Sequence, residues 1–244
     1  MVAGEAVSAK KDLSKFRNVA RSHNLQRFFQ TGPGQYGEGD LFLGITVPQI
    51  RSVARIHSEM TLPEIEKLIT SKYHEERFCA LVVLANQFKK SQDILYRKKI
   101  YNFYVRKIRE GYVNNWDLID VTGSQIAAHL LTLDNPYEVL RKYTKSENLW
   151  LRRASIVFTF PFIREGDVGI TLSIAEDLLH DSHDLIHKAT GWALREVGKK
   201  DIFALRSFLN LHVQEMPRTM LRYAIEKLPT EERKRLLLTK NNNK

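Results

Sequence analysis

The feature that most constrains this chain is a helical pattern that recurs about every 35 residues. Apolar residues recur at three- and four-residue spacing along almost the whole chain, and no segment alternates like a half-buried strand. Alanines inside three apolar helical segments, at Ala154, Ala189 and Ala224, lie at equal intervals of 35 residues. A period of roughly 35–40 residues with two helices per unit is typical of HEAT- and TPR-like repeats.

We therefore predict an all-α fold, a HEAT-like helical-repeat solenoid (an α-α superhelix) with a concave basic groove. Residues 1–11 are predicted to form a flexible N-terminal tail, residues 12–239 a single HEAT-like-repeat domain, and residues 240–244 a flexible C-terminal tail. The spacing of apolar residues, prolines and turn residues predicts helices over 12–30, 48–58, 62–71, 74–90, 92–111, 115–132, 136–145, 148–163, 168–180, 183–199, 201–213, 217–228 and 230–239.

The same register extends backwards along the chain. Ile119 lies one period before Ala154, and the small pair Cys79–Ala80 lies about two periods before it. A small residue lets the inner helices of adjacent units approach closely, and such helices line the concave surface of a solenoid. In this register the residues expected along one groove are Trp116, Asp120, Arg152, Arg153, Lys188, Trp192, Arg195, Arg218 and Arg222.

An excess of basic residues favours a polyanionic partner. The chain has 38 Lys and Arg against 28 Asp and Glu, a formal charge of +10. Basic residues cluster at 89–90, 97–99, 106–109, 152–153 and 199–200, and solvated helix faces are the simpler interpretation of the 97–109 cluster. Arg and Trp on the inner-helix register suit phosphate contact better.

We expect the protein to be cytoplasmic. Cys79 is the only cysteine, so an intrachain disulfide is impossible and a reducing compartment fits. Residues 1–11 contain no apolar core of a signal peptide, and no apolar run approaches the roughly 20 residues of a membrane span. We also expect that the protein does not associate with membranes and that it is a monomer.

The stretch Asn114–Asp120 contains the clearest candidate for chemistry. It is predicted to open a helix, and Trp116 and Asp120, four residues apart, then share one face. Asn114 or Asn115 suits the N-cap, and Asp117 in the first turn suits the helix dipole. The alternatives are core packing for Trp116 and Trp192 and a structural ion pair of Asp120 with Arg152 or Arg153. Trp150, between two leucines, is expected in the core.

Two other patterns carry little functional weight. Gly32–Gly37 matches G-x-G-x-x-G, but a helix precedes it and a loop follows, so a dinucleotide site is not expected. His183 and His187 are spaced i, i+4, but with His180 they flank a turn and form no H-E-x-x-H motif. We predict no metal site.

Four motifs in order resemble the AlkD-like DNA glycosylases, the HEAT-like-repeat enzymes of DNA alkylation repair. The resemblance covers about residues 36 to 228. The motifs are Phe42-Leu43-Gly44-Ile45-x-x-Pro48, Asn115-Trp116-Asp117-x-x-Asp120, Leu149-Trp150-x-Arg152-Arg153-Ala154 and Lys188-Ala189-x-Gly191-Trp192-x-Leu194-Arg195-Glu196.

The resemblance implies excision of cationic alkylated purines, 3-methyladenine and 7-methylguanine, from double-stranded DNA, without a metal or organic cofactor. The catalytic set that it implies falls on Trp116, Asp120, Arg153 and Trp192, while Arg152 beside Arg153 leaves the register of the arginine open. With the basic residues of the repeat register, the predicted DNA-binding set is Arg152, Lys188, Arg195, Lys199, Arg218 and Arg222.

Two other classes of function remain open from the sequence. Some relatives of this fold lack the catalytic set, which would make the chain a non-catalytic DNA-binding module. HEAT arrays also commonly act as protein-interaction scaffolds. The range of alkyl adducts and any lyase step cannot be predicted from the sequence.

Overall fold

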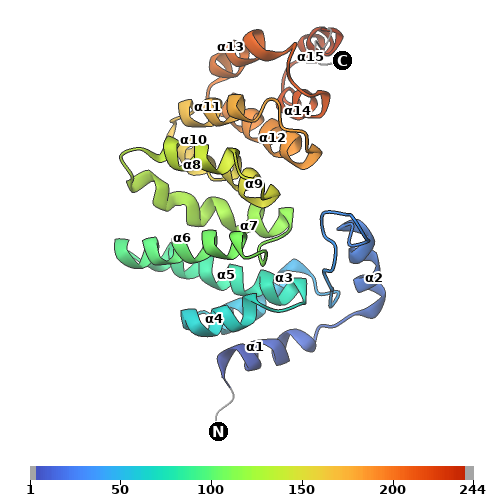
Figure 1. The fold of residues 1–244 in the computed structure, drawn as a ribbon, viewed down its shortest axis with the longest axis vertical. Helices are drawn as coiled ribbons and strands as arrows, with labels where there is room; N and C mark the ends of the chain where they lie inside the picture. The colour runs from blue at the N-terminus through green and yellow to red at the C-terminus, as the bar shows by residue number, and fades with distance from the viewer. Residues whose placement is uncertain (1–3, 240–244) are drawn as a thin grey trace. The chain divides into compact units, whose positions relative to one another are not determined.

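The computed structural model describes residues 4–239, and its regular structure there is helical (Figure 1). The described residues contain no strand, only an isolated bridge between Leu41 and Tyr73. The predicted all-α, helical-repeat class is confirmed. The contacts divide the chain into two compact units, the first ending at Ile126 and the second beginning at Ala127. In neither unit is a described helix long and apolar enough to cross a membrane.

Unit 1 is built around one buried helix. Its helices are α1 (Glu5–Ser14), α2 (Val19–Phe28), α3 (Val47–Ile56), α4 (Leu62–Ile69), α5 (His74–Lys90), α6 (Ile94–Arg109) and α7 (Trp116–Ile126). Helix α5 packs against α3, α4, α6 and α7. Ala80 of α5 and Ile119 of α7, both on the predicted repeat register, are fully buried.

Unit 2 repeats this arrangement around α12. It contains the 3-10 helix η1 (Ala127–Thr132) and the α-helices α8 (Pro136–Thr144), α9 (Leu149–Val157), α10 (Phe160–Glu165), α11 (Gly169–Asp177), α12 (Asp184–Lys200), α13 (Ile202–His212), α14 (Arg218–Ala224) and α15 (Thr230–Leu238). Helix α12 packs against α9, α11, α13 and α14.

The 35-residue register corresponds to a row of packed helices formed by α9, α12 and α14. Ala154, Ala189 and Ala224 lie in α9, α12 and α14, and all three are buried. A close approach occurs at Gly191 of α12, where a Cβ would lie 2.4 Å from the carbonyl oxygen of Met220 in α14. The register therefore predicted correctly which helices form the row in this unit. The concave groove stays a prediction.

The predicted domain boundaries need one correction. Residues 5–11, expected to be a flexible tail, belong to α1, whose Ala6, Ala9 and Leu13 are buried. The backbone N–H of Ala6 also donates to Glu64 Oε2 at 2.9 Å. Two of the three core residues of α1 are alanines in a polar segment, so their apolar stripe is weak in the sequence. The predicted tail at 240–244 lies outside the described residues.

Two predicted helices are each interrupted in the structure, and a third, 115–132, changes from an α-helix to a 3-10 helix at Ala127. The predicted helix 12–30 breaks before Asn18, which caps α2 by accepting from the N–H of Arg21. The predicted helix 148–163 divides into α9 and α10, with Pro161 in the first turn of α10. Proline lacks an N–H donor and favours the start of a helix over its interior.

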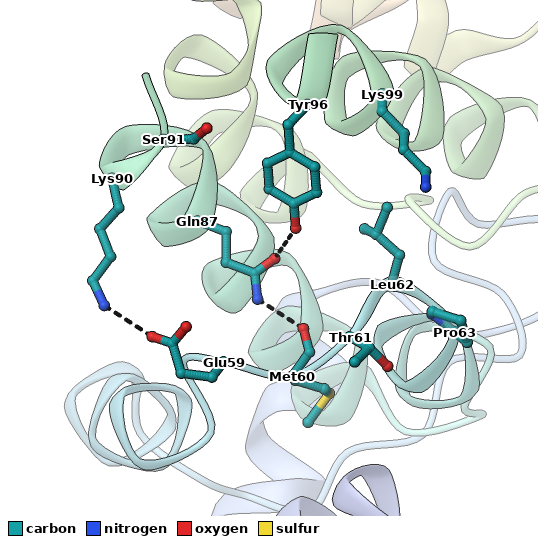
Figure 2. A pocket seen from close by; sticks show the side chains of 10 residues that line it. All are labelled: Glu59, Met60, Thr61, Leu62, Pro63, Gln87, Lys90, Ser91, Tyr96 and Lys99. Atoms are coloured by element: carbon teal, nitrogen blue, oxygen red, sulfur yellow. Dashed lines mark hydrogen bonds and ion pairs between the residues drawn. The ribbon is translucent and has the colours of Figure 1, made fainter. Parts of the chain in front are cut away.

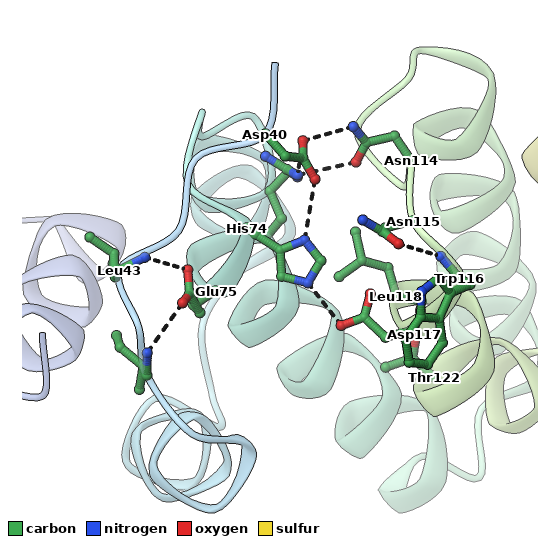
Figure 3. A network of polar contacts seen from close by, with 12 residues as sticks. Asp40, Leu43, His74, Glu75, Asn114, Asn115, Trp116, Asp117, Leu118 and Thr122 are labelled. Carbon is green, nitrogen blue, oxygen red and sulfur yellow. Dashed lines mark hydrogen bonds and ion pairs between the residues drawn. The ribbon is translucent and has the colours of Figure 1, made fainter. Parts of the chain in front are cut away.

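The loop 41–46 is held against the start of α5 by one buried carboxylate. Glu75 accepts hydrogen bonds from the backbone N–H groups of Leu43, Gly44 and Ile45 at 2.8, 2.8 and 3.2 Å (Figure 3). Gly44 has φ +81°, and a Cβ there would lie 2.0 Å from the carbonyl oxygen of Asn18. The loop thus requires glycine at this position for both backbone conformation and space.

We predict that Gly44→Ala destabilises the protein by about 3 kcal/mol or more, because the methyl group adds a backbone clash to a left-handed conformation. The measurement is the free energy of unfolding in urea. Gly34→Ala is the matched control, since Gly34 has φ +72° but a Cβ there meets no described atom within 4 Å. It should cost only about 1 kcal/mol. Equal losses in the two variants would contradict the close packing of Gly44.

Candidate active site

Helix α7 exposes one narrow stripe that contains both predicted catalytic residues of unit 1. Trp116 and Asp120 are partly exposed, whereas Asp117, Leu118 and Ile119 between them are buried. The prediction that Trp116 and Asp120 share a face is consistent with this pattern of burial. The same helix therefore presents an aromatic ring and a carboxylate on its partly exposed side, while its other side is buried.

Two phenylalanines at the end of α2 surround the ring of Trp116. Phe29 stacks on Trp116 with 5.4 Å between ring centroids, and Phe28 meets it edge-on at 6.1 Å. Phe28 is 63% exposed although it is a large apolar residue. An exposed aromatic beside a partly exposed tryptophan forms a surface on which a flat ring can stack. Trp116 is thus neither a core residue nor an isolated surface residue.

The start of α7 is anchored by a buried polar network (Figure 3). His74 lies between two carboxylates, with Nε2 2.8 Å from Asp117 Oδ2 and Nδ1 3.3 Å from Asp40 Oδ2. Asp40 also accepts from Arg77 at 2.7 Å and from the side-chain amide of Asn114 at 2.9 Å. Asn114, a predicted N-cap candidate, therefore binds the 40–46 loop rather than the helix.

The surroundings of His74 favour its charged form. Burial lowers its pKa, but the charge of Asp117 and the hydrogen bonds to Asp117 and Asp40 outweigh burial and raise the pKa to about 9. Burial likewise opposes ionisation of Asp40, yet its hydrogen bonds to His74 and Asn114 and the charge of Arg77 lower its pKa overall. At neutral pH the network therefore contains two cations and two carboxylates.

The other two predicted catalytic residues lie in unit 2. Trp192 is partly exposed on α12 and packs against Phe160, with 4.5 Å between ring centroids. Arg153 is buried in α9, and its guanidinium donates to the carbonyl of Leu185. Two of the four predicted catalytic residues thus belong to unit 1 and two to unit 2, and their joint role stays a prediction. Trp150 is buried, as expected.

Arg152 and Arg153 differ in their surroundings, which bears on the open register between them. Arg152 donates to Asp181 Oδ2 at 2.7 Å and to the carbonyls of Ser146 and Glu147. It thus joins the turn before α9 to the turn before α12. These contacts hold Arg152 within unit 2, and the assignment of the catalytic role to Arg153 stays a prediction.

Most of the predicted DNA-binding residues have partners inside unit 2. Lys188 pairs with Asp184 at 2.7 Å, Lys199 with Glu196 at 2.7 Å, and Arg195 with Glu226. Arg218 donates to the carbonyl of Leu237 at the end of α15. Arg222 is exposed, and no hydrogen bond or ion pair is found for it among the described residues. These surface pairs are weak and can exchange for phosphate.

The histidines of the 180–187 segment take structural roles. His183 caps α12 by accepting from the N–H of Leu185 at 3.1 Å, and His187 Nε2 bonds to the carbonyl of Asp181. Among residues 4–239, no group of three or more His, Cys, Asp or Glu side chains could hold a metal ion.

A hollow in unit 1 lies between the start of α4 and the facing ends of α5 and α6 (Figure 2). It measures about 520 Å³. Its polar groups bind one another: Gln87 donates to the Met60 carbonyl at 2.7 Å, Tyr96 donates to Gln87 at 2.9 Å, and Lys90 pairs with Glu59. None of the predicted catalytic residues lines it.

The fold defines the class of the protein: an all-helical repeat protein. Its candidate site is the partly exposed ring and carboxylate on α7. The sequence matches the DNA alkylation repair enzyme family over residues 9–228, and the chain belongs to that family. Its fold is similar to that of a solved structure titled a predicted DNA alkylation repair enzyme from Enterococcus faecalis. The TM-score is 0.68 at 12% identity, covering 88% of this chain and 97% of that one. No curated protein sequence matches.

Sequence reasoning missed the residues that support Trp116. His74 and Asp40 lie 43 and 77 positions before Asp117 and show no spacing that relates them to it. Phe28 and Phe29 did have a signal, since two adjacent aromatics directly before a glycine-rich turn cannot both face one helix core. Asp117 was explained by the helix dipole alone, whereas the structure adds a buried charged partner.

We predict that the stability supplied by His74 is lost at alkaline pH. Its folded-state pKa of about 9 lies above the ordinary 6.5, so its contribution is complete below pH 6.5 and disappears as the pH rises through 9. The full contribution is about 3 kcal/mol. The measurement is the urea unfolding free energy from pH 6 to 10. Because His74→Gln cannot titrate, the wild-type advantage over it should shrink with pH, and a constant difference would refute the prediction.

Proposed function

We propose that the chain is a monofunctional DNA glycosylase that hydrolyses the N-glycosidic bond of cationic N-alkylated purines in duplex DNA during base excision repair. The expected substrates are 3-methyladenine and 7-methylguanine. Membership of the DNA alkylation repair enzyme family supports a role in the repair of alkylated DNA. The observation that carries the proposal is the partly exposed stripe of α7, which contains Trp116 and Asp120 one turn apart while Asp117, Leu118 and Ile119 between them are buried.

The chemistry suits a single carboxylate. An N-alkylated purine carries a positive charge, so it departs as a neutral base when the bond from C1′ to nitrogen breaks and its electron pair moves to the base. The sugar becomes oxocarbenium-like, as in other glycosidic cleavages. Asp120 would stabilise this cation and accept a proton from the water whose oxygen bonds to C1′. Trp116 would add a cation–π contact to the sugar.

The remaining predicted residues fit supporting roles. By resemblance to the family, Trp192 and Arg153 complete the catalytic set, with Arg153 orienting Asp120 or holding a phosphate near the lesion. We propose that Arg152, Lys188, Arg195, Lys199, Arg218 and Arg222 contact the DNA backbone. The proposed reaction requires no metal or organic cofactor, and we propose that the protein acts as a monomer on DNA in the cytoplasm.

We predict that Asp120→Asn lowers the release of 7-methylguanine from methylated duplex DNA by at least about a hundredfold, because the amide cannot stabilise the sugar cation. The released bases are identified and quantified by mass spectrometry. DNA affinity, measured by fluorescence anisotropy, should not decrease, since the variant removes a negative charge. The matched control is Asp134→Asn, which changes an exposed aspartate in the turn before α8. Full activity of Asp120→Asn would contradict the assignment of Asp120 as the catalytic carboxylate.

A second prediction separates a DNA-binding protein from a protein-interaction scaffold. A scaffold should show a salt dependence of DNA affinity no steeper than that of one or two phosphate contacts. We expect a steeper dependence, and Arg222→Gln should reduce the slope of log K against log salt by about one contact. The control is Arg206→Gln, because Arg206 is already bound by Glu232 through two 2.9 Å hydrogen bonds. Equal slopes in all three proteins would exclude Arg222 from the interface.

A further inference from the structure

The ring of His74 satisfies its contacts only when both nitrogens are protonated. Each nitrogen faces a carboxylate oxygen, at Asp117 on one side and Asp40 on the other, and a carboxylate can only accept. A neutral imidazole has one N–H and would leave a lone pair directed at one of the two carboxylates. The geometry alone therefore indicates an imidazolium.

Asp117 depends on His74 more than Asp40 does. Asp40 has Arg77 and Asn114 as further donors, whereas the second oxygen of Asp117, Oδ1, is buried with no hydrogen-bond partner among the described residues. A buried carboxylate that loses its cation is strongly unfavourable, so the surrounding chain moves to reach water. The chain that would move here is the first turn of α7.

His74 is connected to Trp116 in two ways. One route passes through Asp117, the residue next to Trp116 in the chain. The other passes through a cluster of rings: Phe42 and Phe29 both contact His74, at 4.6 and 5.2 Å between centroids, and also each other at 5.1 Å. Trp116 then stacks on Phe29 at 5.4 Å. Both the backbone and the ring of Trp116 are thus supported from the same imidazole.

We propose that His74 is a positioning residue for the site on α7: its imidazolium fixes the Trp116 ring and the helical turn that leads to Asp120, and loss of its positive charge releases them. The inference rests on the proposed function for its catalytic consequence. The structural part, the control of Trp116 by His74, stands independently of any activity.

Loss of the proton changes the charge balance directly behind Trp116. The charged groups that face the ring are Asp40 from the 40–46 loop, Asp117 from α7 and Arg77 from α5 itself, while α2 contributes the uncharged Phe29. With His74 protonated these four charges sum to zero. Without it, one carboxylate is uncompensated, and Asp117, which has no other hydrogen-bond or ion-pair partner among residues 4–239, is the one that must adapt.

Fluorine NMR of the full-length protein labelled with 5-fluorotryptophan tests the structural part. The chain has three tryptophans, so Trp150 and Trp192 serve as internal references, and Trp116→Phe assigns the third resonance. We expect the Trp116 resonance to shift or broaden as the pH rises through about 9, while the other two stay unchanged. Trp116 and reference resonances that respond identically would overturn the proposal.

Two substitutions of His74 separate its contacts. Gln places an amide nitrogen near the former Nε2, so it keeps a donor to Asp117 without the charge, whereas Asn places one near Nδ1 and keeps only the contact to Asp40. We expect the Trp116 resonance to be perturbed at all pH values in His74→Asn, and less so and without a pH transition in His74→Gln. The control is His57→Gln, because His57 also pairs with an aspartate, Asp12 at 2.9 Å, far along the chain from α7.

Base release by the same variants tests the catalytic consequence. His74→Asn should lower kcat by about 10- to 100-fold with unchanged DNA affinity, since misplacement of catalytic groups by about 1 Å has effects of this size. Wild-type activity should fall above pH 9, and this alkaline limb should be absent from His74→Gln. An alkaline limb that persists in His74→Gln, or a His74→Asn variant with wild-type kcat, would overturn the proposal.

The two proposals fail in distinguishable ways. If the wild-type protein releases no alkylated base while the Trp116 resonance follows His74 as expected, then the glycosylase assignment is wrong and the positioning role stands. If the wild type is active and the Trp116 resonance does not respond to the protonation or substitution of His74, the positioning role is wrong and the glycosylase assignment stands. Circular dichroism spectra of the His74 variants verify that each is folded before comparison.

Discussion

The buried imidazolium of His74 is the interaction on which the site in unit 1 depends. It joins three segments that are distant in sequence: the 40–46 loop through Asp40, the start of α5, and the start of α7 through Asp117. A buried ion pair contributes little net stability compared with apolar packing, but removal of one partner is costly. Such a network specifies one arrangement of the three segments, and here that arrangement determines where Trp116 lies.

Close helix packing has the corresponding role in unit 2. The approach of α14 to Gly191 leaves no room for a side chain on that face of α12, and the next residue, Trp192, stays partly exposed beside Phe160. A glycine inside a helix lowers its intrinsic stability by about 1 kcal/mol. Its presence here is explained by the contact with Met220. In both units, therefore, a partly exposed tryptophan stands next to a closely packed part of the fold.

The family motifs divide into structural and chemical parts when they are placed on the structure. The Phe42–Pro48 motif supplies the N–H groups that bind Glu75, the glycine that packs against Asn18, and one ring of the aromatic cluster around His74. These contacts fix the loop that directly follows Asp40, a member of the buried network. The Asn115–Asp120 motif contains both kinds of residue, since Asp117 faces the network while Trp116 and Asp120 face solvent.

The sequence by itself determined the helical class, the repeat register and the shared face of Trp116 and Asp120. These follow from local spacing: apolar residues at helical intervals must share a side, and small residues 35 positions apart mark equivalent helices. The helical start of the chain at α1 and the partners of Asp117 were not predictable in this way. The alanines of α1 form an apolar stripe that is weak in the sequence. The meeting of Asp40, His74 and Asp117 depends on how a loop and two helices pack. Only the tertiary structure brings those charges together, because no local rule relates residues that are 34 and 43 positions apart.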